Sequence, residues 1–176
     1  KFWKDDFSVD TSSNYTLSSG TITLEPGVLK LTEIPSSGEA DAHRLSLNQP
    51  IGSPRYISFT LSIDPDNTLS GKYRYVYGYI GGKTCFRMYR ENNDAFLSVA
   101  VYRPYEDVVV TRYKNDTEYT FAYYEDGTLN VYMDGKLVGT STQQFPEGTL
   151  ELRVRNNAAS GGLFEFKQIT LGSSAS

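Results

Sequence analysis

The sequence has very little cysteine or histidine: Cys85 and His43 are the single examples among 176 residues. One cysteine excludes an internal disulfide, so the chain either works among reducing thiols or is an extracellular domain that is stable without cross-links. Two such residues also cannot supply the Cys/His ligand sets of zinc and iron sites. The single cysteine therefore does not decide between an intracellular and an extracellular location.

An excess of positive charge is lacking as well. The net charge is −4 and the isoelectric point is near 5.0. Binding to phosphate backbones or to anionic lipid needs clustered Lys and Arg on a basic chain. No apolar run approaches the roughly 20 residues that span a bilayer. Neither nucleic acid nor a membrane is expected as a partner.

Material for a packed core is plentiful, because 39% of the residues are hydrophobic and 14% are aromatic, with 14 Tyr and 9 Phe. The length suits one domain. We expect a single domain over residues 1–171. Residues 172–176, Gly-Ser-Ser-Ala-Ser, are predicted to be a flexible tail or the start of a linker to another module. A larger modular parent protein is therefore expected.

Short runs with period-two alternation fill the chain, and no long apolar stripe with helical spacing is present. About fourteen strands are indicated, more than the roughly ten that one open sheet usually holds. Two antiparallel sheets packed face to face are predicted. The expected strands are Phe2–Phe7, Thr21–Leu24, Val28–Thr32, Arg44–Leu47, Tyr56–Ile63, Arg74–Ile80, Thr84–Arg90, Phe96–Tyr102, Val108–Arg112, Tyr119–Tyr124, Leu129–Met133, Lys136–Ser141, Leu150–Val154 and Leu163–Leu171.

Three short glycine-containing segments separate alternating runs: Gly81-Gly82, Glu125-Asp126-Gly127 and Asp134-Gly135. Glycine adopts the positive φ angles that tight hairpin turns require. Each segment is therefore predicted to join the two strands of a hairpin.

The stretch Tyr119–Gly139 resembles a hairpin of the concanavalin A-like lectin and glucanase jelly rolls, which include laminin-G-like and many carbohydrate-binding domains. Asp5–Ser8 followed by Val28–Leu31, and the closing Gly161–Ile169, resemble the first and last strands of that superfamily. The resemblance implies an all-β jelly-roll sandwich whose first and last strands pair. It specifies fold better than activity, because one fold hosts many functions.

The run Tyr73–Ile80 alternates tyrosine with other residues, so its four tyrosines share one face of a strand. The aliphatic faces of this and the next two runs are expected to be buried together: Val76, Ile80, Phe86, Met88, Leu97, Val99 and Val101. The opposite faces then form a surface of Tyr75, Tyr77, Tyr79, Arg87, Tyr89 and Tyr102. Aromatic rings pack on the C–H faces of sugars while polar groups bind the hydroxyls, so this surface is the predicted carbohydrate site. The alternative is that these tyrosines form the core layer between the sheets.

The segment Glu39-Ala-Asp41-Ala-His43-Arg44 invites comparison with the Glu-x-Asp-x-(x)-Glu strand of the glucanase relatives. The second glutamate is missing, and retaining hydrolysis needs two carboxyl groups about 5 Å apart. A polysaccharide lyase would use a His or Tyr base with a group that neutralises a uronate, and His43, Arg44 and Gln49 together with the tyrosine face supply those residue types. No catalytic residue is assigned on these patterns.

Acidic residues gather in Asp64-Pro-Asp66-Asn67, and Asp5-Asp6 with Glu165 is a second acidic group. Calcium prefers such hard oxygen ligands, and several domains of the resembled superfamily hold a structural calcium ion. Asp64 and Asp66 are the candidate ligands, and solvated acidic turns are the alternative.

The sequence thus predicts a non-catalytic carbohydrate-binding module that recognises a polysaccharide or glycan and lies outside the cell or on its surface. Two alternatives stay open. One is a polysaccharide lyase or glycoside hydrolase with a non-standard site, and the other is a structural or adhesive surface domain.

Overall fold

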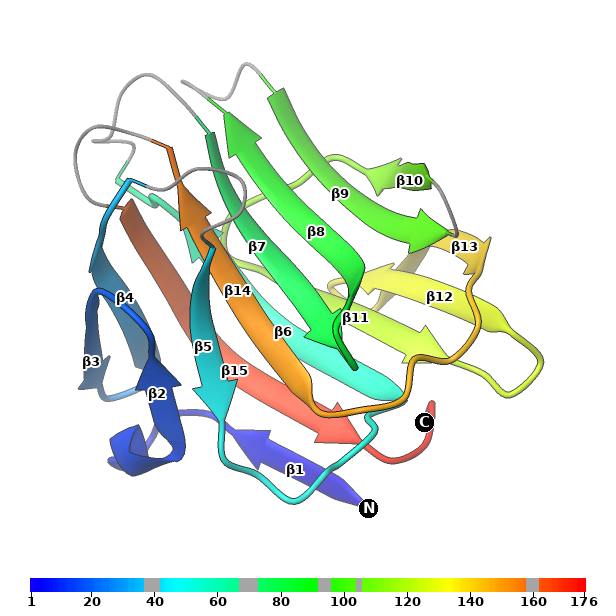
Figure 1. Cartoon of the computed structure of the whole chain (residues 1–176), viewed down its shortest axis with the longest axis horizontal. Coiled ribbons are helices and arrows are strands. Elements are labelled where there is room, and N and C mark those ends of the chain that lie inside the picture. The colour runs from blue at the N-terminus through cyan, green and yellow to red at the C-terminus, as the bar shows by residue number, and fades with distance from the viewer. Residues whose placement is uncertain (37–41, 67–72, 92–95, 104–105, 158–161) are drawn as a thin grey trace.

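Two antiparallel sheets lie face to face in the computed structural model, with the seven-stranded sheet toward the viewer in Figure 1. The structure describes residues 1–36, 42–66, 73–91, 96–103, 106–157 and 162–176. Every strand pairing in these ranges is antiparallel. The predicted all-β sandwich is confirmed.

The eight-stranded sheet has the order β13 (Lys136–Thr142), β12 (Thr128–Met133), β11 (Thr117–Tyr123), β6 (Tyr56–Ile63), β15 (Gly162–Gly172), β4 (Val28–Ile34) and β3 (Thr21–Glu25). The eighth strand, β1 (Phe2–Asp5), pairs with the last part of β15, from Ile169 to Gly172. The expected pairing of the first and last strands is therefore present.

The seven-stranded sheet has the order β10 (Glu106–Thr111), β9 (Phe96–Arg103), β8 (Lys83–Glu91), β7 (Tyr73–Ile80), β14 (Leu150–Asn156), β5 (His43–Leu47) and β2 (Tyr15–Leu17). A short 3-10 helix, η1 (Ser12–Asn14), precedes β2. All fourteen predicted strands are found, with ends shifted by a few residues at most. Strand β2 was not predicted, because three residues are too few to show an alternation.

The three predicted hairpin turns all occur: β7–β8, β11–β12 and β12–β13 are adjacent antiparallel pairs. Gly81, Gly82, Gly127 and Gly135 have φ angles of 60°, 79°, 87° and 79°. These angles lie in the left-handed region that glycine adopts without steric cost.

The inner faces of the two sheets form one core. Val76, Ile80, Phe86, Met88, Val99 and Val101 are all completely buried in it, as predicted, and the Leu97 side chain lies outside the described residues. Phe86 stacks on Phe121 of the other sheet with a centroid distance of 4.0 Å. The period-two alternation therefore identified the inner face of the seven-stranded sheet correctly.

Charged side chains are also buried at one end of this core. Nη1 of Arg90 donates to the carbonyl oxygens of Ile63 and of Asp64, the latter at 2.6 Å. Nη1 of Arg74 lies 3.9 Å from Oδ2 of Asp64, and both side chains are at most 2% exposed. Carbonyl and carboxylate oxygens thus compensate the buried guanidinium charges.

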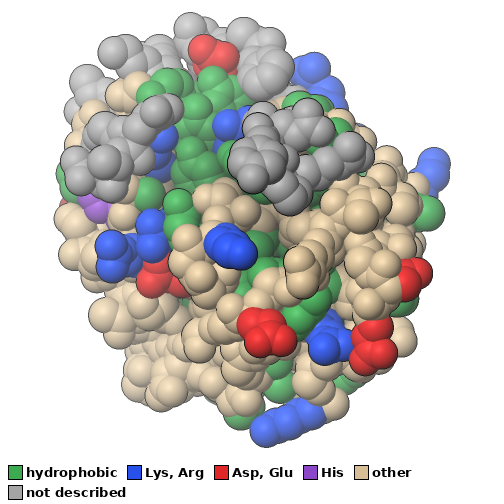
Figure 2. All heavy atoms as spheres, turned by 45° about the vertical axis from the view of Figure 1, so that its right-hand side comes forward, with side chains coloured by type: hydrophobic (Ala, Val, Ile, Leu, Met, Phe, Trp, Pro, Cys, Tyr) green, Lys and Arg blue, Asp and Glu red, His purple; other side chains and the backbone are tan. Residues whose placement is uncertain are grey.

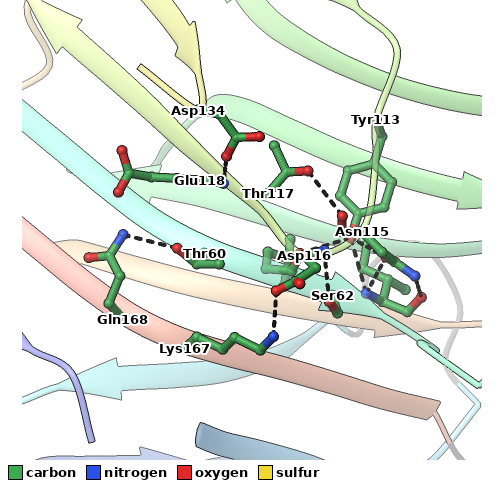
Figure 3. Close-up of polar contacts among 12 residues, drawn as sticks. Thr60, Ser62, Tyr113, Asn115, Asp116, Thr117, Glu118, Asp134, Lys167 and Gln168 are labelled. Carbon is green, nitrogen blue, oxygen red and sulfur yellow. Dashed lines mark hydrogen bonds and ion pairs between the residues drawn. The ribbon is translucent and has the colours of Figure 1, made fainter. Parts of the chain in front are cut away.

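Figure 3 shows the polar contacts that hold β11 and the residues before it against β6 and β15. Oδ1 of Asn115 accepts from the Tyr113 hydroxyl at 2.6 Å and from the Ile63 backbone N–H at 2.8 Å, and Nδ2 donates to the Ile63 carbonyl. Lys167 of β15 pairs with Asp116. These contacts fix the entry to β11 on the eight-stranded sheet.

Among the described residues the structure contains no helix with the length and hydrophobicity that crossing a membrane requires.

Candidate functional site

The outer face of the seven-stranded sheet carries the predicted site. On β7 the side chains of Arg74, Val76 and Ile80 point inward, and these three residues and Gly78 are buried. Since successive side chains alternate, Tyr73, Tyr75, Tyr77 and Tyr79 point outward. The alternative in which these tyrosines form the layer between the sheets is therefore wrong.

Neighbouring strands add further aromatic and cationic side chains to this outer face. Across from Tyr75 lie Tyr89 of β8 and Arg155 of β14. Across from Tyr77 lie Arg87 and Arg153 on the same two strands. We call this surface the tyrosine–arginine face; it comprises Tyr73, Tyr75, Tyr77, Tyr79, Arg87, Tyr89, Arg153 and Arg155. Figure 2 shows side chains of the hydrophobic class, which includes tyrosine, beside Lys and Arg side chains on this side of the molecule.

The tyrosine rings pack against each other. The ring centroid of Tyr75 lies 5.2 Å from that of Tyr77 and 4.5 Å from that of Tyr89. As a result Tyr75 is only 7% exposed and Tyr89 only 8%, whereas Tyr77, Tyr79 and Arg87 are half-buried. Of the predicted residues, the half-buried ones therefore offer more surface to a ligand than Tyr75 and Tyr89 do.

Arginine side chains lie on these rings. Cζ of Arg153 is 3.7 Å from the centroid of Tyr79, and Cζ of Arg87 is 5.3 Å from Tyr75 and 5.5 Å from Tyr89. Such cation–π contacts hold a guanidinium in a defined orientation over an aromatic ring. The guanidinium groups of Arg87 and Arg153 therefore lie over the tyrosine rings and form part of this surface.

Arg153 and Arg155 were not predicted as site residues. The alternation in Leu150–Arg155 places Glu151, Arg153 and Arg155 on one face of β14, and the sequence contains that signal. The sequence gives no local indication that β14 pairs with β7, because the two strands are about seventy residues apart in the chain. Nη2 of Arg155 donates to the hydroxyl of Tyr73 at 2.9 Å, and Arg155 is 2% exposed.

Two phenol groups of this face, those of Tyr75 and Tyr89, have a raised pKa. Burial raises the pKa of Tyr75 well above its ordinary value. Burial, followed by a hydrogen bond to Glu91, raises the pKa of Tyr89 to about 12. The hydroxyls of Tyr75 and Tyr89 therefore act as neutral donors and acceptors.

The candidate catalytic residues do not converge on this face. His43 lies opposite Val154 on the inner side of β5, is buried, and has Nε2 3.1 Å from the carbonyl oxygen of Pro35. Arg44 points to the outer side, and Gln49 forms its hydrogen bonds with the backbone of Ile51. Glu39 and Asp41 lie outside the described residues. The grouping of His43 with the tyrosine face is therefore wrong, since the inward side of β5 packs in the core.

The two candidate calcium ligands, Asp64 and Asp66, lie in different environments. Asp64 is buried beside Arg74, whereas Asp66 is exposed. A calcium ion takes six to eight oxygen ligands. In the described ranges no group of three or more His, Cys, Asp or Glu side chains has a metal-binding arrangement. The calcium assignment stays a prediction.

A pocket of about 630 Å³ adjoins the Tyr79 end of the face. Its lining includes Tyr102, Thr84, Gln143 and Phe145, and Thr84 lies opposite Tyr79 in the β7–β8 register. The side-chain amide of Gln143 donates to the carbonyl oxygens of Cys85 and Tyr102. Tyr102, a predicted site residue, is therefore part of this pocket wall.

No protein-family model and no curated protein sequence matches the chain. Solved structures do resemble it. A sialidase structure has a TM-score of 0.68 and 16% identity over 98% of this chain, which spans only 18% of that longer chain. The Bacillus licheniformis β-glucanase has a TM-score of 0.63 and 13% identity, covering 97% of both chains. The carbohydrate recognition domain of Emp46p, in a potassium-bound form, has a TM-score of 0.59 and 12% identity over 97% of this chain and 95% of its own.

The chain thus has the concanavalin A-like fold, a two-sheet antiparallel jelly roll shared by lectins, carbohydrate-binding domains and glucanases. The resemblance stated from the sequence is confirmed at the level of fold. Identities of 12 to 16% fix the fold alone.

Proposed function

We propose that this domain is a non-catalytic carbohydrate-binding module and that it holds a polysaccharide or glycan on the tyrosine–arginine face. The observation that carries the proposal is the orientation of β7, which buries Val76 and Ile80 and turns four tyrosines outward. A face with only a structural role does not require four tyrosines, each with a hydroxyl group at the end of its ring.

The chemistry of the face suits a sugar. Tyr77 and Tyr79 are half-buried, so each presents ring area together with a hydroxyl group. Rings of this kind pack on the C–H faces of a pyranose, and hydroxyl and guanidinium groups bind its oxygens. The fold adds support, because it includes lectins and glucanases.

Hydrolysis is less well supported by the described carboxylates of this face. Glu151 lies opposite Tyr79 and Glu91 lies opposite Tyr73, six residues apart along β7. At about 3.4 Å per residue the two carboxylates are roughly 20 Å apart along the strand direction. The carboxyl pairs of glycoside hydrolases are about 5 to 10 Å apart. Binding without bond cleavage is therefore the better-supported function.

We further propose that the domain, residues 1–171, is one module of a larger protein that is extracellular or on the cell surface. A match over 18% of a sialidase chain is an example of this fold within a longer protein. Fractionation of the source cells, followed by detection with an antibody to the domain, tests the location.

Glycan-array screening followed by calorimetry tests the binding function. The array is run once with calcium and once with chelator, so that a calcium requirement for binding is also detected. Loss of one stacking residue is expected to weaken binding about 5- to 30-fold, or about 1 to 2 kcal/mol. We expect this loss for Tyr77→Ala.

Tyr132→Ala is the matched control, since Tyr132 is a half-buried tyrosine on β12 of the other sheet. It should leave the affinity unchanged. Equal affinity of the Tyr77→Ala and wild-type proteins, with both folded by circular dichroism, would remove this face from the binding site. The release of reducing ends or unsaturated sugars from the polysaccharide would instead favour an enzyme.

A further inference from the structure

One row of side chains runs across the tyrosine–arginine face at right angles to the strands. In the sheet register Arg44 of β5 lies opposite Arg153 of β14, Arg153 lies opposite Tyr77 of β7, and Tyr77 lies opposite Arg87 of β8. Neighbouring strands are about 4.8 Å apart, so the row extends over roughly 14 Å. Three arginines therefore flank one tyrosine along a single line.

The arginines cover much of the aromatic surface. Arg153 lies 3.7 Å above the ring of Tyr79, and Arg87 lies over both Tyr75 and Tyr89. A ligand that approaches those three rings meets guanidinium groups as well as aromatic carbon. This arrangement favours a ligand with anionic groups over one that binds by ring stacking alone.

The charge of the face is opposite in sign to that of the chain. The outward side chains of β5, β14, β7 and β8 include four arginines, Arg44, Arg87, Arg153 and Arg155, and two glutamates, Glu91 and Glu151. The whole chain has a net charge of −4. Arg74 and Arg90 of the same strands point inward, but the outward side chains still carry more positive than negative charge on a chain that is acidic as a whole, which attracts anions to that face.

We propose that the glycan bound on this face is anionic, and that Arg87 and Arg153 bind its carboxylate groups on the two sides of Tyr77. This inference rests on the proposed function. A planar guanidinium has five N–H donors and matches a carboxylate with two parallel hydrogen bonds. Nε of Arg153 already donates to Glu151 at 2.6 Å, and this orients the group while using one of its five donors.

Arg155 has a different role. It is 2% exposed and lies 5.2 Å from the ring centroids of both Tyr73 and Tyr75. Its Nη1 and Nη2 atoms contact the hydroxyls of Tyr77 and Tyr73. Arg155 is therefore a positioning residue for the tyrosines, and Arg87 and Arg153 are the ligand-binding cations.

Two matched pairs of probes test the proposal on the unaltered protein. The first pair is an oligogalacturonate and its methyl ester, in which a neutral ester replaces each carboxylate. The second pair is sialyllactose and lactose. We expect the charged member of at least one pair to bind about 10-fold more tightly at low salt, and the preference to shrink at 1 M salt, where screening acts over roughly 3 Å. The pair that shows it distinguishes a uronate chain from a terminal sialic acid.

Arg87→Gln and Arg153→Gln should each weaken binding of the charged probe about 5- to 30-fold and that of its neutral partner less than 2-fold. Lys136→Gln is the control, since it removes one exposed positive charge from the first residue of β13, on the other sheet. Arg87→Lys keeps the charge without the planar fork and should lose less affinity than Arg87→Gln.

Equal affinities for the charged and neutral members of both pairs would overturn the proposal that the ligand is anionic, but they would not contradict the proposed function. A preference that survives in both glutamine variants would overturn the roles of Arg87 and Arg153. No binding of any of the four probes, nor of any glycan on the array, would remove the proposed function and this inference with it. The probe comparison uses the wild-type protein, so it decides the proposal even where a variant fails to fold.

Discussion

Replacement of Gly78 by alanine should destabilise the domain because Phe86 occupies the space that a side chain would need. Gly78 lies opposite Phe86 in the β7–β8 register. A Cβ atom at this position would lie 2.2 Å from Cε2 and Cζ of Phe86 and 2.6 Å from Cε1. These distances are far below van der Waals contact, so the Phe86 ring must move or the strand must shift.

The Phe86 ring has little room to move. It is completely buried, and its centroid lies 4.0 Å from that of Phe121 and 5.7 Å from that of Phe59. Overpacking of a well-filled core costs about 1 to 3 kcal/mol and occasionally more. Because the ring is stacked on one neighbour and near a second, we expect Gly78→Ala to cost about 3 kcal/mol, at the upper end of that range.

Urea unfolding followed by tyrosine fluorescence or circular dichroism measures this free energy. The melting temperature should also fall by roughly 2 to 4 °C per kcal/mol for a chain of this size. Gly52→Ala is the control, because nothing lies within 4 Å of its Cβ position and its φ angle is not in the left-handed region. That variant should change the stability by less than about 1 kcal/mol.

A double variant isolates the contact. Phe86→Leu alone should cost about 1 to 2 kcal/mol as a large-to-small core change. If the clash is the cause, Gly78→Ala combined with Phe86→Leu should be less destabilising than the sum of the single changes, by about 1 kcal/mol or more. Strictly additive free energies would refute the steric explanation.

Three further predictions concern the core and are tested by urea unfolding. Val99→Ala should cost about 2 to 4 kcal/mol through lost burial and a cavity; a cost below about 1 kcal/mol would contradict the completely buried position of Val99. Burial raises the pKa of the Cys85 thiol from 9.0 to about 11, so its contribution to stability is complete below about pH 9 and is lost as the pH rises to 11. Wild-type stability should therefore fall relative to Cys85→Ala across that range, and parallel profiles would speak against the shift. Asp64→Ala should cost about 3 to 5 kcal/mol by leaving Arg74 buried without its carboxylate, whereas Asp64→Ala combined with Arg74→Met removes both charges and should cost clearly less; a larger cost for the double variant would contradict this.

Strand positions and side-chain faces could be predicted because both depend on local sequence. The alternation in Tyr73–Ile80 is determined by strand geometry, and the faces it indicated are those observed. Hairpin turns with glycine fixed three neighbouring strand pairs in the same way. Each of these predictions needs only residues that are close in the chain.

The composition of the site depends instead on which distant strands lie side by side. Arg153 and Arg155 reach the tyrosines because β14 enters the sheet between β7 and β5. No feature within Leu150–Asn156 indicates these neighbours. His43 does not join the tyrosines for a related reason: the first residue of β5 falls on the inward side of a strand whose outward side carries Arg44.

The buried charges follow from the same register that exposes the tyrosines. If β7 places Val76 and Ile80 in the core, then Arg74, an even number of residues away, must point inward too. A slip of one residue would expose the valine and isoleucine and bury the tyrosines. The register is held by the fit of Phe86 against Gly78, where no other residue leaves room for the ring. The inward Arg74 is tolerated because Asp64 lies within 3.9 Å, although Nε and Nη2 of Arg74 have no hydrogen-bond partner among the described residues. The tyrosine–arginine face and the buried arginine are therefore two results of one strand register, and a variant that shifts this register should alter both.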